Sequence, residues 1–267
     1  MASIMMNRER PFVYIASLRR TGSTALSEAL TLLPYCFIFR EPNLGRDRFS
    51  MKAGDAEIFM KYGIDLLGFK EKWSGRQRKF LLDAFKKELI PQIGSHIAQI
   101  GVKEIRHEGW RKYLKQFPEM KVLLTARDPR DIYISLHYRV KSGKGKWTGE
   151  YSAERVVEDL KRQFGYQKEM FGKADCLKVR YEDLCKNPSV IDNVRRFICS
   201  KAPSIGMIGA FNAKNPNRIE EFEVHGNSIT QKRINRWRWE MDKALVAEAQ
   251  KVFSLMCEYN EFWGYLE

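Results

Sequence analysis

The stretch YIASLRRTGSTALSEAL, residues 14–30, begins as a short apolar strand, passes through a turn rich in arginine and small hydroxyl residues, and continues as a helix. A strand ending at Ser17, a turn through Gly22 and a helix beginning near Ser23 or Thr24 would aim main-chain N–H groups and the positive end of the helix at one point. The stretch therefore predicts an anion-binding site. The alternative is an ordinary turn whose hydroxyls only cap the helix.

The turn has the spacing of the nucleotide-binding phosphate loop, G-x4-G-K-[ST]. The residues in register are Ser17, Gly22, Ser23 and Thr24. Ser23 stands where that loop has lysine, and the positive charge lies upstream, at Arg19 and Arg20. Because the lysine and a nearby Mg²⁺ neutralise a triphosphate, its absence argues against ATP hydrolysis. Arginines combined with hydroxyls and main-chain donors suit a diphosphate-like group that needs no metal.

Apolar runs of strand length alternate with longer helical patterns along the chain. The runs cover 11–17, 36–39, 101–105, 121–126 and 176–179; the helical patterns cover 24–33, 77–98, 109–117, 129–139, 153–173, 189–199 and 238–260. Strands of this kind predict a parallel sheet covered on both faces. We expect one α/β domain over residues 1–267, a three-layer α/β/α fold with a central parallel sheet and a flexible N-terminus at 1–10.

A second strand-to-helix junction lies in KVLLTARDPRDIYISLHYR, residues 121–139. Arg127 ends the strand, and Ser135 follows eight residues later on the helix. A phosphate-loop hydrolase usually has an acidic Mg²⁺ ligand here; Asp128 is available for that role, but Arg127 precedes it. We interpret this junction as a second phosphate contact. The alternative is a salt bridge from Arg127 to Asp131, with Ser135 at an ordinary helix position.

The net charge of +14 predicts a surface that attracts anions, without choosing among nucleotides, nucleic acids and acidic lipids. The cysteines are five, widely spaced and free of any CxxC pair, which argues against disulfides and a zinc site. No apolar stretch reaches the roughly 18 residues that span a bilayer. We expect a soluble, cytoplasmic protein, although a chain lacking its leader or membrane anchor would look the same.

Together the two junctions resemble the sulfotransferase family, which uses 3′-phosphoadenosine 5′-phosphosulfate (PAPS). Arg19, Arg20, Thr21, Gly22, Ser23 and Thr24 resemble its 5′-phosphosulfate loop, [PX]-[RK]-[ST]-G-[ST]-T. The stretch from Arg127 to Ser135 resembles its 3′-phosphate motif, R-[DN]-P-[RK]-D-x3-S. The resemblance implies a P-loop-like sulfotransferase fold, a PAPS donor with product PAP, and no metal.

Weaker matches extend the resemblance over residues 11–240. VRYEDLCKNP, residues 179–188, is similar to a strand-end segment whose tyrosine lies near the nucleotide, which implies a role for Tyr181. INRWRWE, residues 234–240, resembles a segment that follows a loop over the 3′-phosphate, which implies contacts from Lys232 and Arg233. The stretches 43–100 and 140–175 match nothing and are expected to hold acceptor specificity. Two basic or glycine-containing segments, 140–151 and 203–228, are predicted loops.

Sulfuryl transfer needs a stabilised leaving group and a base for the acceptor's proton. Arg20 and the loop donors are implied for the first task. For the base the sequence offers Glu41, Glu104, His107 and His137. Glu41, which opens EPNLG, resembles the glutamate of the glycan and tyrosylprotein branches, and is preferred; its alternative is a surface pair with Arg40 or Arg46. His107, in IRHEGW, resembles the histidine of the small-molecule branch. Lys103 and Arg106 are candidates to face the same cleft.

The acceptor stays open among a sugar hydroxyl, a lipid or polyketide alcohol, a phenol and a protein tyrosine. Two other functions fit part of the pattern. A nucleotide or small-molecule kinase would share the strand, turn and helix, and Mg²⁺-dependent nucleotide binding would distinguish it. An RNA- or polyanion-binding protein would use the charge and aromatics such as Trp147, Trp237 and Trp239, but no RNA-binding motif is present and no nucleic-acid partner is expected.

Overall fold

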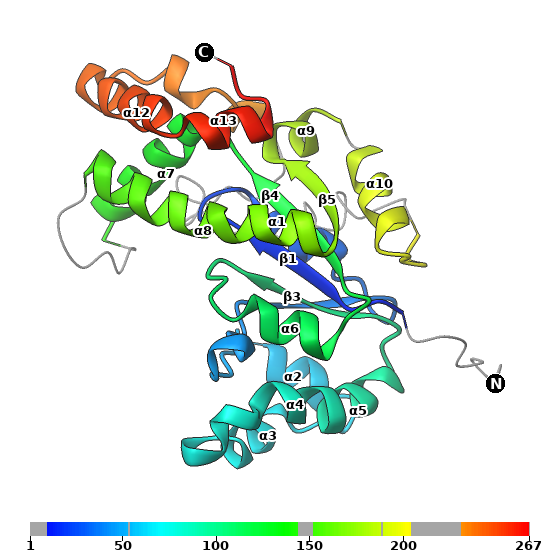
Figure 1. Ribbon diagram of the computed structural model, residues 1–267. Helices are drawn as coiled ribbons and strands as arrows, with labels where there is room; N and C mark the ends of the chain where they lie inside the picture. Colours follow the sequence, from blue (N-terminus) through cyan, green and yellow to red (C-terminus); the bar gives the residue numbers. More distant parts are fainter. Residues whose placement is uncertain (1–9, 53, 144–151, 188, 204–230, 267) are drawn as a thin grey trace.

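The computed structural model describes residues 10–52, 54–143, 152–187, 189–203 and 231–266. Its centre is a sheet of five parallel strands in the order β2-β3-β1-β4-β5 (Figure 1). The strands are β1 (Val13–Ser17), β2 (Phe37–Arg40), β3 (Ile100–Glu104), β4 (Lys121–Ala126) and β5 (Asp175–Arg180). Each lies within a residue or two of its predicted position, so the predicted parallel sheet is confirmed.

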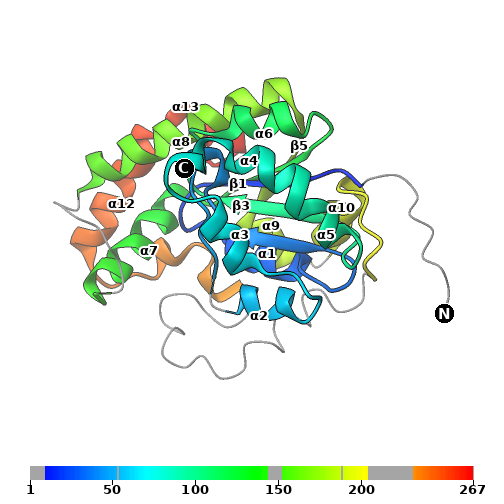
Figure 2. The ribbon, with the colours of Figure 1, turned by 90° about the horizontal axis from the view of Figure 1, so that it is seen from below.

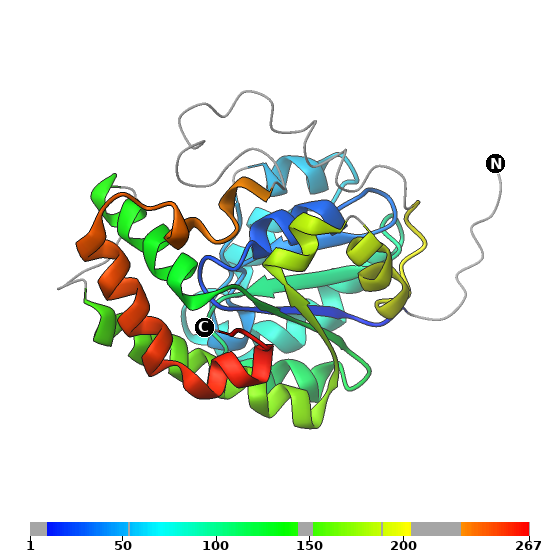
Figure 3. The same ribbon diagram turned by 90° about the horizontal axis from the view of Figure 1, so that it is seen from above.

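Helices cover both faces of the sheet, which confirms the three layers (Figures 2 and 3). One face carries α1 (Ser23–Leu30), α9 (Tyr181–Lys186) and α10 (Ser189–Phe197), and the other carries α6 (Trp110–Gln116) and α8 (Ala153–Lys173). Side chains alternate along β1. Val13 and Ile15 join the core under α1, whereas Tyr14 and Ala16 join the larger core under α6 and α8.

The helix predicted over 238–260 is wrong in its bounds, because it consists of two helices. They are α12 (Lys243–Leu255) and α13 (Cys257–Trp263). The chain becomes helical only after Asp242, whose carboxylate accepts a hydrogen bond from the N–H of Leu245 at 3.1 Å and so caps α12. Helix α12 lies beside α7 (Pro129–Lys141), beyond the end of β4, and α13 follows α12 (Figure 1).

The segment between β2 and β3 is helical but less regular than the single helix predicted over 77–98. It contains α2 (Asp55–Met60), α3 (Leu66–Lys72), a 3₁₀ segment (Gly75–Phe80), α4 (Leu81–Ala84), a π-helical turn (Phe85–Leu89) and α5 (Ile90–Gly94). Pro91 has no N–H to donate to the preceding turn, and the wider π turn lies directly before it.

The predicted loops 140–151 and 203–228 lie, apart from 140–143 and 203, outside the described residues, as does most of the predicted flexible N-terminus. Among the helices that the structure describes, none is long and apolar enough to cross a membrane.

Candidate anion and sulfuryl-transfer site

The turn that follows β1 requires glycine at position 22. Gly22 has a left-handed backbone with φ of 73°, and a Cβ added there would lie 2.2 Å from the ring of Tyr181. Tyr181 begins α9, directly after β5. The close contact brings the predicted tyrosine against the predicted loop.

Main-chain carbonyls on both sides of the turn are held by side-chain donors. Before the turn, Gln167 Nε2 donates to Ala16 O at 2.8 Å, and His107 Nε2 donates to Ser17 O at 3.0 Å. Within the turn, Thr21 Oγ1 donates to Leu18 O at 2.8 Å, and an Arg127 guanidinium nitrogen donates to Arg20 O at 3.4 Å. The N–H that follows each carbonyl points the opposite way, because C=O and N–H are antiparallel in a planar trans peptide. The carbonyl contacts therefore turn the loop's N–H groups away from these donors.

Helix α1 adds further donors at the same place. Gly22 precedes it and offers no side-chain cap, while the first N–H groups of a helix have no acceptor within the helix. The positive end of the helix dipole lies there as well. The loop thus has the features of an anion-binding turn rather than of a capped helix start.

Arg127, which follows β4 and is buried, joins three segments. Its guanidinium donates to Arg233 O at 2.6 Å, lies 3.6 Å from Asp131 Oδ2 and stacks 4.7 Å from the ring centre of Tyr181. Its Nε is also buried, and among the described residues no acceptor reaches it. The salt bridge to Asp131, which was the alternative to a phosphate contact, is present, but among the described residues it leaves a donor of Arg127 available.

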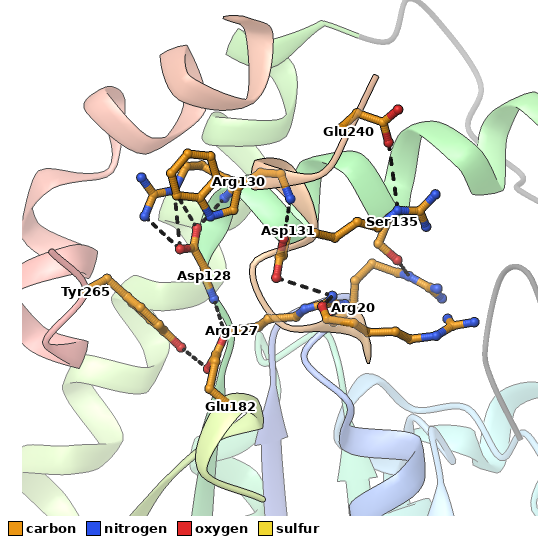
Figure 4. A network of polar contacts seen from close by, with 12 residues as sticks. Arg20, Arg127, Asp128, Arg130, Asp131, Ser135, Glu182, Glu240 and Tyr265 are labelled. Atoms are coloured by element: carbon orange, nitrogen blue, oxygen red, sulfur yellow. Dashed lines mark hydrogen bonds and ion pairs between the residues drawn. The ribbon is translucent and has the colours of Figure 1, made fainter. Parts of the chain in front are cut away.

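Arg20 meets Ser135 across the two junctions: Arg20 Nε donates to Ser135 Oγ at 2.8 Å (Figure 4). Burial, together with the positive charges of Arg139, Arg127 and Arg233, lowers the pKa of Arg20 to about 9. Several guanidinium groups thus converge where their like charges oppose one another. An anion placed among them would relieve that repulsion.

The other predicted loop residues have different surroundings. The Thr21 hydroxyl is occupied, since it also meets Thr125 Oγ1 at 2.7 Å. Ser23 is buried and Thr24 is exposed in the first turn of α1. Arg19 pairs with Asp159 of α8 at 3.4 Å. Lys232 is exposed, next to Arg233.

Asp128, the possible magnesium ligand, is engaged elsewhere. Arg130 pairs with its carboxylate through Nε and a terminal nitrogen at 3.0 and 2.8 Å (Figure 4). The Arg130 guanidinium in turn lies 3.9 Å from the ring centre of Trp237 and 3.8 Å from that of Phe253. In the parts of the chain that the structure covers, no group of three metal-ligating side chains is found.

Glu41, the preferred base, follows β2 and has a left-handed backbone with φ of 57°. Its carboxylate forms an ion pair with the ammonium group of Lys103, and its N–H donates to Lys103 O at 2.6 Å. Burial alone would raise its pKa, but the charge and hydrogen bond of Lys103, with the charges of Lys52 and Arg19, lower the pKa below its usual value. Glu41 is therefore ionised at neutral pH, half-buried, and electrostatically coupled to Arg19 of the loop.

Glu104, the neighbour of Lys103 on β3, points to the opposite face of the sheet. Its Oε1 accepts from the N–H of Asn43 at 2.7 Å and from the hydroxyl of Tyr113 at 3.2 Å. Burial raises its pKa to about 8. Glu104 thus ties the segment that follows Glu41 to the sheet.

The structure places His107 beneath the loop. It is fully buried, and its ring nitrogens contact Ser17 O at 3.0 Å and the Tyr14 hydroxyl at 3.1 Å. This position disfavours His107 as a base, because neither nitrogen faces the surface of the loop that would meet an acceptor. His137 is half-buried on α7, with its ring 5.6 Å from that of Tyr138.

Sequence reasoning missed the glutamines of α8. Gln163 Oε1 accepts from the N–H of His107 at 2.9 Å, and Gln167 Nε2 donates to Ala16 O and also to Thr125 O at 3.1 Å. Their signal was present: both occupy the apolar, inward side of a strongly amphipathic helix, where a polar residue must find a buried partner.

The fold is that of an α/β protein of the P-loop-like class, and the turn after β1 has the geometry of an anion-binding loop. A family model described as the sulfotransferase family matches residues 11–198, most of the chain. The chain therefore belongs to the sulfotransferase family. No match was found among curated proteins.

Solved structures of sulfotransferases have a similar fold. Mouse sulfotransferase SULT7A1 complexed with PAP has a TM-score of 0.54 at 13% identity, with 94% of this chain and 86% of that chain covered. The sulfotransferase domain from the curacin biosynthetic pathway has a TM-score of 0.59 at 16% identity, covering 94% and 99%. The sulfotransferase domain from the Synechococcus PCC 7002 olefin synthase has a TM-score of 0.53 at 17% identity, with 94% of this chain and 96% of that chain covered. At such identities the likeness supports the fold alone.

Glu104 makes the stability of the protein depend on pH. In the folded protein it keeps its proton up to about pH 8, whereas the unfolded chain loses it near 4.5. Between these values the folded state binds more protons, so the free energy of unfolding should fall as pH rises, with a slope of up to about 1.4 kcal/mol per pH unit from this group. Urea unfolding from pH 5 to 9 measures it. In Glu104→Gln, which keeps a neutral side chain of the same shape, that contribution should vanish; an unchanged slope would contradict it.

Proposed function

We propose that this member of the sulfotransferase family uses PAPS as its sulfuryl donor. The observation that carries the proposal is the convergence of Arg20, Arg127 and Ser135 beside a loop whose carbonyls are tied inward. A donor with phosphate groups at both ends of a nucleoside would suit two such anion contacts. The mouse neighbour's complex with PAP supports the same choice.

Two regions would hold the donor. The loop N–H groups, Arg20, Ser23 and Thr24 would bind the 5′-phosphosulfate, while Arg127, Ser135 and the segment carrying Lys232 and Arg233 would bind the 3′-phosphate. The buried Arg127 Nε, which has no acceptor among the described residues, and the lowered pKa of Arg20 fit bound phosphate at these points. Tyr181, packed on Gly22, would line the nucleotide side.

The anion loop and the general base have separate tasks in the proposed reaction. When bound, PAPS supplies a sulfuryl group with a nucleotide leaving group. The acceptor oxygen attacks sulfur in line, the bond from sulfur to the phosphate oxygen breaks, and the acceptor's proton passes to Glu41. Arg20 and the loop donors would stabilise the charge on the departing oxygen. Glu41 suits the base because it is ionised, half-exposed and near enough to feel the charge of Arg19.

The alternatives are less favoured. A kinase would need Mg²⁺ ligands, and the carboxylate of Asp128 is already bound by Arg130. A polyanion-binding role rests on composition alone. The acceptor class remains a sugar, lipid or polyketide alcohol, phenol or tyrosyl hydroxyl.

Calorimetric titration with adenosine 3′,5′-bisphosphate tests the donor. The wild type should bind it equally with and without Mg²⁺, and more tightly than ATP. Arg127→Ala should weaken binding about ten- to hundredfold, the range for losing a charged hydrogen bond. Arg78→Ala removes the same charge from the exposed surface of the 3₁₀ segment and is the matched control.

Ser135→Ala, a smaller change, replaces Arg127→Ala if circular dichroism shows that the latter is unfolded. A preference for ATP with Mg²⁺ would refute the PAPS proposal and support the kinase.

Glu41→Gln tests the base. Removing a general base should lower kcat about 10²- to 10⁴-fold, while bisphosphate binding stays unchanged. Transfer of ³⁵S-labelled sulfuryl from PAPS to a panel of sugar, phenol and tyrosyl-peptide acceptors gives the rate. Glu57→Gln, on the exposed side of α2, is the matched control. Full activity of Glu41→Gln would exclude Glu41 as the base.

A further inference from the structure

The main chain of β1 loses its neighbour on one side before the anion loop begins. The β1–β3 pairing ends at Ala16 and Glu104, whereas the β1–β4 pairing continues to Ser17 and Thr125. Ser17 O therefore lies beyond the end of the β1–β3 ladder. His107, a few residues after β3, supplies the donor that the strand no longer provides, through Nε2 at 3.0 Å.

The two contacts of the ring fix where its proton lies. A main-chain carbonyl only accepts, so Nε2 must carry the hydrogen. Nδ1 then carries none and accepts from the Tyr14 hydroxyl at 3.1 Å. The main-chain N–H of His107 is held as well, by Gln163 Oε1 at 2.9 Å. The imidazole is thus a neutral, fully buried link between β1, the segment after β3 and α8.

We propose that His107, oriented by Tyr14, is a positioning residue of the anion loop: its Nε2–H holds the Ser17 carbonyl inward, and the peptide N–H groups beyond it face the donor. This inference rests on the proposed PAPS site. It gives His107 a role in donor binding and not in proton transfer from the acceptor.

The surroundings keep this link neutral over the working range of pH. Burial lowers the pKa of His107 to about 4, although its bond to Ser17 O and the charge of Glu108 act to raise it. Tyr14 is the other titratable group in contact, and burial with the charges of Glu104 and Glu108 raises its pKa well above the usual value. Neither group changes charge between pH 5.5 and 8.

Two substitutions separate positioning from catalysis. The amide nitrogen of glutamine can occupy the place of Nε2 and donate to Ser17 O, whereas leucine of similar size cannot. The Kd for adenosine 3′,5′-bisphosphate should rise about tenfold in His107→Leu and by less than about threefold in His107→Gln. In His107→Gln, kcat should be largely retained, with an unchanged pH profile from 5.5 to 8. His96→Leu changes an exposed histidine whose ring centre lies 5.0 Å from that of Tyr62, and this variant should bind like the wild type.

The outcomes distinguish this inference from the proposed function. Wild type that does not bind the bisphosphate would overturn the PAPS proposal itself. A different result would overturn the positioning role and restore His107 as a catalytic base. In that result, wild type and His107→Leu bind the bisphosphate equally well, and kcat falls by the same factor in His107→Leu and His107→Gln. If thermal denaturation shows His107→Leu to be unfolded, Tyr14→Phe, which removes only the hydroxyl, should still weaken binding a few-fold; unchanged binding would contradict the inference.

Discussion

The inward direction of the carbonyls around the first turn is the constraint on which the site depends. Those of Ala16, Ser17, Leu18 and Arg20 all accept from side chains, and three of the donors come from α8, the segment after β3 and the end of β4. A buried carbonyl without a partner costs free energy, so each donor stabilises one peptide orientation. The anion loop is thus shaped by distant parts of the sequence as much as by its own residues.

The same arrangement concentrates positive charge. Burial lowers the pKa of both Arg20 and Arg233, and the charge of Arg127 lowers both further. The nearby acids are themselves buried. Burial raises the pKa of Asp131 to about 6, with Arg127 opposing the shift. Asp131 also accepts from the N–H of Trp237 at 3.1 Å, which connects α7 to the segment carrying Arg233. The fold thus holds several arginines together at one place, where a bound anion would relieve their mutual repulsion.

Much of the sheet and of the arginine cluster could be predicted from the sequence, because strands and phosphate-type turns have local sequence patterns. The five apolar runs predicted the strands. Arg20, Gly22 and Arg127 follow strand ends and Ser135 lies on the helix after one, which brought them to one edge of the sheet. The break in the last helix and the π turn before Pro91 were not readable at that level, since capping and packing decide them. The burial of His107, one of the candidate bases, was not readable for a related reason: whether a histidine is exposed or buried depends on residues such as Tyr14 and Gln163, far away in sequence.

Amide resonances of ¹⁵N-labelled protein, followed during addition of adenosine 3′,5′-bisphosphate without Mg²⁺, test the central claim most directly. If the loop N–H groups and the start of α1 bind phosphate, the amides of Gly22, Ser23 and Thr24 should shift most and saturate at one affinity. Those of α3, which carries the exposed Lys70 and Lys72, should stay in place. Shifts spread over exposed lysines and arginines, with the loop amides unchanged, would show that the positive charge attracts anions generally and that the loop binds none.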